Sequence, residues 1–168
     1  MTQDWNALAG TFDDEPDHGL RDPGVRRAWW SLLEPLLPPA PARIADLGCG
    51  TGSLTLLLTD HGHEVTGLDQ APAMLERARS KLGGRASLVQ GDAAHPPLPA
   101  AAFDVVLARH ILFALPEPEA VVGRWVRLLA PGGGFCSWRA SGRRASDSAP
   151  RRCGSSCCSI ERRPPSSG

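Results

Sequence analysis

The chain contains no tyrosine, and Lys81 is the only lysine among its 18 basic side chains. We attribute this bias to GC-rich coding, which is unrelated to function. The formal net charge is zero, and no run of about eighteen apolar residues predicts a membrane span. The first residues, Met1–Asp4, do not resemble a charged and apolar secretory leader. We therefore expect a cytoplasmic protein with no membrane partner.

The length of 168 residues suits one domain with a core of its own. We expect three consecutive parts along the chain. Residues 1–42 form an N-terminal helical cap segment, residues 43–138 form the ligand-binding core, and residues 139–168 form a tail rich in Arg, Ser, Pro and Cys.

The most informative segment of the core is DLGCGTGS at residues 46–53, which lies between a short apolar stretch and a leucine-rich stretch. This order predicts a strand, a tight turn and a helix. Three glycines at alternate positions let a ligand approach the backbone at the helix N-terminus. A dinucleotide fingerprint needs its third glycine one position later, where Ser53 stands. Asp46 would repel a pyrophosphate and attract a cation, so the turn favours a cationic nucleoside cofactor over NAD.

Strand and helix patterns alternate along the core. Apolar runs predict strands at residues 43–46, 64–69, 86–90 and 103–108, and helical spacing predicts helices at 23–36, 51–61, 72–82 and 118–129. Alternation of this kind predicts a Rossmann-like, doubly wound parallel α/β sheet with helices on both faces. Ligands bind outside the carboxyl ends of such strands. Asp69 ends the second strand, where a carboxylate can accept both hydroxyls of a ribose.

With these residues the chain resembles the class I S-adenosylmethionine-dependent methyltransferases. The resemblance runs from DLGCGTGS through GLDQAPAML, GDA, FDVVLARHILFAL and LLAPGGG, over about residues 5–134. It implies S-adenosylmethionine as cofactor and an unidentified small-molecule acceptor. It implies that the methionine part lies at the glycine turn, the ribose at Asp69, and the adenine at the next two motifs. The implied cofactor residues are Asp46, Gly48, Cys49, Gly50, Gly52, Asp69, Gln70, Met74, Asp92, Ala93 and Arg109.

Methyl transfer from a sulfonium depends mainly on positioning of the acceptor. A nitrogen or thiol acceptor needs little help, whereas an enol, phenol or carbon acceptor needs a base. Either His110 or His18 could supply such a base. His110 is the candidate catalytic residue, with capping of a loop as its alternative role. Phe12 and His18 are candidate substrate or lid residues, and Phe12 has plain packing as its alternative. We expect Trp29 and its neighbour to be core and rim residues.

The last third does not continue the family's pattern. The resemblance implies a strongly apolar fifth strand, further helices and a hairpin that completes a seven-stranded sheet. This chain has FCSW at residues 135–138, followed by a polar tail that cannot offset its ordering entropy. We therefore expect an incomplete sheet of about five strands and a disordered tail. If the codons of residues 134–140 are read one base earlier, Phe followed by Cys always yields Leu, so we hypothesise that the tail is out of frame.

The tail also carries charge and thiols. From Phe135 onward the sequence contains seven arginines and only two acidic residues, and four of the five cysteines also lie in this part. The paired spacing of a zinc site is absent, and no aromatic residue after Trp138 provides a stacking surface for bases. We expect no metal and no nucleic-acid partner. The alternatives for the whole chain are a remnant that at most binds the cofactor and, more distantly, an NAD-binding oxidoreductase; the oligomeric state stays open.

Overall fold

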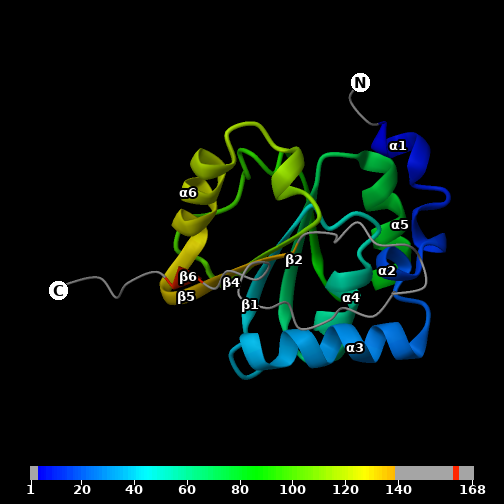
Figure 1. The fold of residues 1–168 in the computed structure, drawn as a ribbon, viewed down its shortest axis with the longest axis horizontal. Coiled ribbons are helices and arrows are strands. Elements are labelled where there is room, and N and C mark those ends of the chain that lie inside the picture. The colour runs from blue at the N-terminus through cyan, green and yellow to red at the C-terminus, as the bar shows by residue number, and fades with distance from the viewer. Residues whose placement is uncertain (1–3, 139–160, 163–168) are drawn as a thin grey trace.

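The computed structural model describes residues 4–138 and 161–162, which include a six-stranded sheet in the order β3-β2-β1-β4-β5-β6 (Figure 1). The strands are β1 (Arg43–Leu47), β2 (Glu64–Asp69), β3 (Ser87–Gln90), β4 (Phe103–Arg109), β5 (Leu129–Trp138) and β6 (Glu161–Arg162). Strands β1 to β5 are parallel, and β6 pairs antiparallel with β5. The predicted α/β fold with five parallel strands is confirmed.

The sheet grows in two directions from β1. Strands β2 and β3 follow on one side, and β4 and β5 follow on the other. Leu47 near the end of β1 pairs with Leu68 of β2 and with Ala108 of β4, so these three strands end at about the same level. The crevice between β1 and β4 is the point where strand order reverses, which is where open parallel sheets bind ligands.

The helices and short 3₁₀ turns connect these strands. They are α1 (Trp5–Leu8), η1 (Phe12–Asp14), α2 (Pro16–Gly19), α3 (Pro23–Leu33), η2 (Glu34–Leu36), α4 (Ser53–Asp60), α5 (Pro72–Leu82), η3 (Leu112–Ala114) and α6 (Pro118–Leu128). Asp22 caps α3 by accepting the Val25 amide hydrogen at 2.9 Å, and Pro23 occupies the first helical position. None of the helices in the described ranges is long and apolar enough to cross a membrane.

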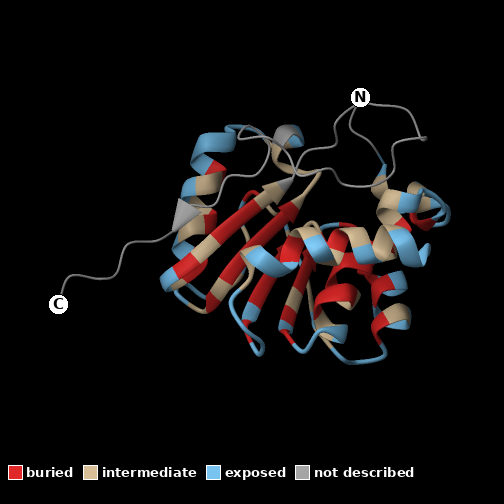
Figure 2. Ribbon diagram, turned by 60° about the horizontal axis from the view of Figure 1, so that its bottom comes forward, coloured by how far each residue is buried: buried red, intermediate tan, exposed pale blue. Residues whose placement is uncertain are grey.

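The central strands of the sheet are largely buried (Figure 2), and their residues contribute to two separate core clusters. On one face, Ile44 packs with Trp29 of α3 and with leucines of α4. On the other face, Ala45 packs in the cluster that contains Trp125 of α6. Trp29 is 2% exposed, so its predicted place in the core is confirmed.

The structure corrects the sequence prediction around β5. The predicted fourth helix ends at Leu128 instead of residue 129, and β5 already includes the three glycines that precede FCSW. The register shifts between Phe103 and Val105, opposite these glycines. A Cβ on Gly133 would lie 3.0 Å from the Asp104 carbonyl oxygen, so glycine permits this close approach.

In the tail, the structure describes only β6. Glu161 pairs with Phe135 and Arg162 pairs with Gly134, so the prediction of a disordered tail is wrong for these two residues. A backbone edge on β5 gives them hydrogen-bond partners that composition does not reveal. The rest of the predicted disordered tail lies outside the described residues.

Candidate functional site

The turn between β1 and α4 has a left-handed backbone at all three glycines. The φ angles of Gly48, Gly50 and Gly52 are +71°, +54° and +75°, a conformation that glycine adopts without steric cost. The amides of Gly48 and Cys49 donate to the Leu68 carbonyl at 2.7 and 3.0 Å, which anchors the turn on β2. The tight turn predicted from the glycine spacing is confirmed.

Three different segments approach this turn closely. A Cβ on Gly48 would lie 2.7 Å from Cγ2 of Ile111, and one on Gly50 would lie 3.3 Å from the ring of Phe12. A Cβ on Gly52 would lie 3.0 Å from that of Ala78 in α5. The glycines therefore allow the chain after β4, the N-terminal segment and α5 to meet at one place. Phe12 lies against the turn, and its role as a lid residue stays a prediction.

Asp69 joins the turn to the start of α5. Its Oδ2 accepts the Gly50 amide hydrogen and its Oδ1 accepts the Ala71 amide hydrogen, both at 2.9 Å. Burial raises the pKa of Asp69, although these backbone hydrogen bonds work to lower it. Each carboxylate oxygen keeps a second lone pair, so the carboxylate retains capacity for hydroxyl groups.

Asp46 lies beneath the same turn and is 2% exposed. Thr55 of α4 donates its hydroxyl hydrogen to Asp46 Oδ2 at 2.7 Å. Burial raises the pKa of Asp46 to about 6, while the Thr55 hydrogen bond and the positive charge of Arg109 oppose that change. A further cation at this place would stabilise the ionised carboxylate.

The residues predicted to contact adenine differ in accessibility. Met74 is 1% exposed and packs against residues of α1 and η1. Gln70 and Asp92 are exposed, at the end of β2 and after β3 respectively. The Ala93 carbonyl accepts the indole hydrogen of Trp125 at 2.6 Å. The structure thus places Met74 under the N-terminal segment and leaves the other side chains facing outward or toward the core.

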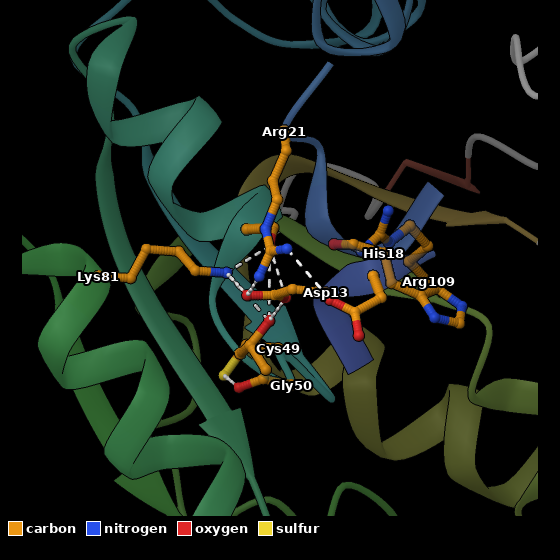
Figure 3. Close-up of polar contacts among 10 residues, drawn as sticks. Asp13, His18, Arg21, Cys49, Gly50, Lys81 and Arg109 are labelled. Atoms are coloured by element: carbon orange, nitrogen blue, oxygen red, sulfur yellow. Dashed lines mark hydrogen bonds and ion pairs between the residues drawn. The ribbon is translucent and has the colours of Figure 1, made fainter. Parts of the chain in front are cut away.

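An ion pair fastens the N-terminal segment to α5. Lys81 Nζ lies 2.9 Å from Oδ2 of Asp13 and donates to the hydroxyls of Ser53 and Thr51 at 2.6 and 3.1 Å (Figure 3). The Thr51 hydroxyl also donates to Asp13. Burial works to raise the pKa of Asp13, but the hydrogen bonds from Thr51 and Lys81 outweigh it and lower the pKa. The sequence did not predict that Asp13, Thr51 and Lys81 lie together. The only hint was that Lys81 is the one lysine of the chain.

Arg109 fastens α2 to the end of β4. Its guanidinium donates to the backbone carbonyls of Asp17 and of His18, the latter at 3.5 Å, and lies 5.1 Å from the ring centroid of Trp29. The His18 ring stacks on Phe12 with centroids 4.3 Å apart. Burial lowers the pKa of His18, and the positive charge of Arg109 lowers it further.

The structure therefore brings the predicted lid and catalytic residues together. His110 lies with its ring centroid 6.0 Å from that of His18, and its Nε2 lies 2.9 Å from Oδ2 of Asp17. Sequence reasoning missed Asp17, because a partner so distant in sequence has no local signature.

A cavity of about 670 Å³ lies beside the Asp13–Lys81 ion pair, between α1 and α5. Its walls include Asn6, Asp13, Arg77 and Lys81, and none of the predicted cofactor residues. The cavity is therefore separate from the glycine turn, where the N-terminal segment packs directly on the backbone.

Cys49 and the remaining cysteines give no metal site in the part that the structure describes. Burial raises the pKa of the Cys49 thiol well above its usual value, and the carboxylates of Asp46 and Asp69 raise it further, so the thiol stays protonated. Residues 4–138 and 161–162 contain no group of three or more side chains suited to a metal ion. Of the four cysteines from Phe135 onward, Cys153, Cys157 and Cys158 lie outside the described residues.

The groups at this edge fit S-adenosylmethionine. Asp46 belongs to β1, Asp69 ends β2 and Asp92 follows β3. Carboxylates accept hydrogen bonds from sugar hydroxyls and attract an ammonium or sulfonium, but they repel a pyrophosphate. These carboxylates therefore suit a cationic nucleoside better than a dinucleotide.

Comparison with known proteins agrees with this chemistry. A family model described as a methyltransferase domain matches residues 45–137. Trans-aconitate 2-methyltransferase of Streptomyces coelicolor is 39% identical over 76% of this chain and 44% of that protein. Demethylmenaquinone methyltransferase of Thermus thermophilus is 41% identical over 58% of this chain and 46% of that protein.

Solved structures of methyltransferases are also similar to this chain. An S-adenosylmethionine-dependent methyltransferase from Mesorhizobium loti superimposes with a TM-score of 0.60 at 31% identity, over 66% of this chain and 52% of that chain. A methyltransferase structure from Methanococcus maripaludis gives a TM-score of 0.72 at 20% identity, over 89% and 71%, which supports the fold alone.

The chain belongs to the class I S-adenosylmethionine-dependent methyltransferase family. It spans about half the length of the curated relatives it matches. The family assignment favours S-adenosylmethionine over the NAD-binding alternative.

Proposed function

We propose that this chain binds S-adenosylmethionine at the carboxyl edge of β1, β2 and β4 and transfers its methyl group to a small-molecule acceptor. The observation that carries the proposal is the left-handed glycine turn, whose Gly50 amide is bonded to the Asp69 carboxylate and which follows the strand that carries Asp46. These charges suit a ligand with two positive groups and a ribose.

The proposed roles follow the strand ends. Asp46 and the turn of Gly48 to Gly52 take the methionine part, and Asp69 takes the ribose hydroxyls. Gln70, Met74, Asp92 and Ala93 surround the adenine. Arg109 holds α2 in place near the methionine end, and Phe12 and His18 of the N-terminal segment cover the bound cofactor. When bound, the cofactor supplies an activated methyl group on a sulfonium.

Calorimetric titration with S-adenosylhomocysteine tests the binding part of the proposal. We expect a saturable heat with one site per chain, and no saturable heat with NADH under the same conditions. Binding of NADH in place of S-adenosylhomocysteine would contradict the proposal. Near-ultraviolet circular dichroism of the same sample checks that the protein is folded.

The second candidate function is a remnant that binds the cofactor without transferring a methyl group. The observation in its favour is the polar, Arg- and Ser-rich sequence of residues 139–168, where the family resemblance implies further strands and helices. Acceptor specificity in this fold depends largely on such later elements. A protein that binds S-adenosylhomocysteine but methylates no member of a panel of phenols, carboxylic acids and amines would support it.

A further inference from the structure

His110 has an unusual backbone and an unpaired ring nitrogen. It follows the last residue of β4 with a φ angle of +62°, in the left-handed region that side chains other than glycine rarely adopt. Such strained positions cluster at functional sites. Its Nδ1 is shielded from solvent and has no hydrogen-bond partner within the described ranges. A buried polar atom without a hydrogen-bond partner destabilises the folded state, so its retention requires an explanation.

The other ring nitrogen has a defined partner. His110 Nε2 lies 2.9 Å from Oδ2 of Asp17, whose Oδ1 accepts the indole hydrogen of Trp29 at 2.8 Å. Burial works to raise the pKa of Asp17, but the His110 hydrogen bond and the charge of Arg109 outweigh it and lower the pKa. An ionised carboxylate only accepts hydrogen bonds. Nε2 of His110 therefore carries a hydrogen, and in the neutral ring Nδ1 carries the free lone pair.

The pair lies where ligands bind in this fold. Strands β1 and β4 are neighbours at the reversal of strand order. Ile111, the residue after His110, approaches the backbone of Gly48 closely. His110 thus lies at the carboxyl end of β4, next in sequence to a residue that contacts the glycine turn, which the proposed function assigns to the methionine part of the cofactor.

A comparison within the chain separates this histidine from a merely buried one. His63 also has an unpaired, shielded Nδ1. It precedes β2, at the amino ends of the strands, and within the described ranges no carboxylate forms a hydrogen bond or ion pair with its ring. The carboxylate partner, the strained backbone and the place at the carboxyl edge distinguish His110.

We propose that His110, oriented by Asp17, is the general base for this methyl transfer, and that the acceptor is a phenol-type hydroxyl rather than a carboxylate. This inference rests on the proposed function. The acceptor O–H bond breaks as its proton passes to His110 Nδ1, and the oxygen forms a bond to the methyl carbon. The carbon–sulfur bond breaks, and its electron pair stays on sulfur as a neutral thioether. Asp17 is a positioning residue, because it acts through the imidazole.

The choice of acceptor follows from Nδ1. A phenol donates a hydrogen bond to the lone pair and needs a base at neutral pH. A carboxylate is already ionised and has no hydrogen to donate to that lone pair.

Nuclear magnetic resonance of the full chain with 15N-labelled histidine tests the geometry, with S-adenosylhomocysteine present and catechol or trans-aconitate as probes. We expect neutral His110 as the Nε2–H tautomer, and a shift of its Nδ1 resonance on addition of catechol alone. The His63 resonances should not move. An Nδ1–H tautomer, no response to catechol, or a response to trans-aconitate would overturn the proposal. Absence of S-adenosylhomocysteine binding would instead contradict the proposed function.

Variants test the two roles. Asp17→Asn should change the tautomer populations of His110, and Asp17→Glu should restore the Nε2–H form. Unchanged populations in Asp17→Asn would overturn the positioning role.

The role of His110 as the base is tested by kinetics. With labelled S-adenosylmethionine and catechol, His110→Gln should lower kcat at least about 100-fold and change S-adenosylhomocysteine affinity less than twofold. The matched control His63→Gln should keep the parent kcat. Equal kcat in His110→Gln and the parent, or no methylated catechol from the parent, would overturn the proposed base.

Discussion

Lys81 and Asp13 form an ion pair of 2.9 Å between the last turn of α5 and η1, with side chains 20% and 8% exposed. Burial lowers the pKa of Lys81, while Asp13 works to raise it. The pair holds the N-terminal segment over the glycine turn, because the same ammonium also donates to Ser53 at the start of α4.

Loss of this cation should destabilise the protein. Lys81→Met leaves the Asp13 carboxylate buried without its partner, and we expect the free energy of unfolding to fall by about 3 kcal/mol. Denaturant titration measures this change. Arg43→Met is the control, because its pair with Asp104 is more exposed and should matter much less. Equal midpoints for the two variants would contradict a structural role for the Lys81 pair.

Stability should depend on the protonation of Asp46. Its pKa is about 6 in the folded protein, against an ordinary value of 3.8 for an aspartate in an unfolded chain. Between these values the folded state keeps a proton that the unfolded state has lost, so the free energy of unfolding falls as pH rises from about 4 to about 6. The loss approaches about 3 kcal/mol and persists above that window.

Asp46→Asn tests this dependence, because the amide does not titrate. Asp69 and His18 also have shifted pKa values, so the informative quantity is the difference between parent and variant in denaturant titrations at pH 4, 5, 6 and 7. We expect Asp46→Asn to gain stability relative to the parent as pH rises. A constant difference across the window would show that Asp46 does not titrate there.

Asp69 is expected to carry the ribose. Asp69→Ala should weaken binding of S-adenosylmethionine by about 1.5–3 kcal/mol, because hydrogen bonds to a charged acceptor are lost. Calorimetry measures the affinity, and Asp60→Ala, at the far end of α4, is the control for loss of a carboxylate. Equal affinity of Asp69→Ala and the parent would refute the ribose assignment.

The glycine turn provides a steric test. Gly50→Val should abolish binding of S-adenosylhomocysteine, because its Cβ would lie 3.3 Å from Phe12 in a backbone with φ of +54°. Gly83→Val is a matched control, since Gly83 has φ of +57° and nothing within 4 Å of an added Cβ. It should suffer similar backbone strain and still bind. A folded Gly50→Val that titrates like the parent would show that the ligand does not lie over this turn.

The reading frame after Gly134 is tested by the nucleotide sequence. We expect the frame that begins one base earlier to encode an alternating apolar pattern without a stop codon. A stop codon or a polar pattern there would contradict the frameshift hypothesis. The division into residues 1–42, 43–138 and 139–168 and the cytoplasmic location also stay predictions; limited proteolysis and cell fractionation test them.

The sequence by itself determined the parallel α/β fold, the glycine turn and the edge at which the ligand is expected to bind. These features depend on local periodicity and on turn chemistry, so β2 and α5 match their predicted bounds. The extent of β5 was not determined in this way, because strand pairing with β4 overrides the turn preference of its glycines.

Tertiary structure alone decided the contacts of the N-terminal segment. The pairs Asp13 with Lys81 and Asp17 with His110 join residues far apart in the chain, and no local pattern encodes them. Asp69 illustrates the division: its place at a strand end follows from sequence, whereas its hydrogen bond to Gly50 depends on how β2 meets the turn. Local periodicity determines the strand or helix position of a side chain, but packing between distant elements determines its hydrogen-bond and ion-pair partners.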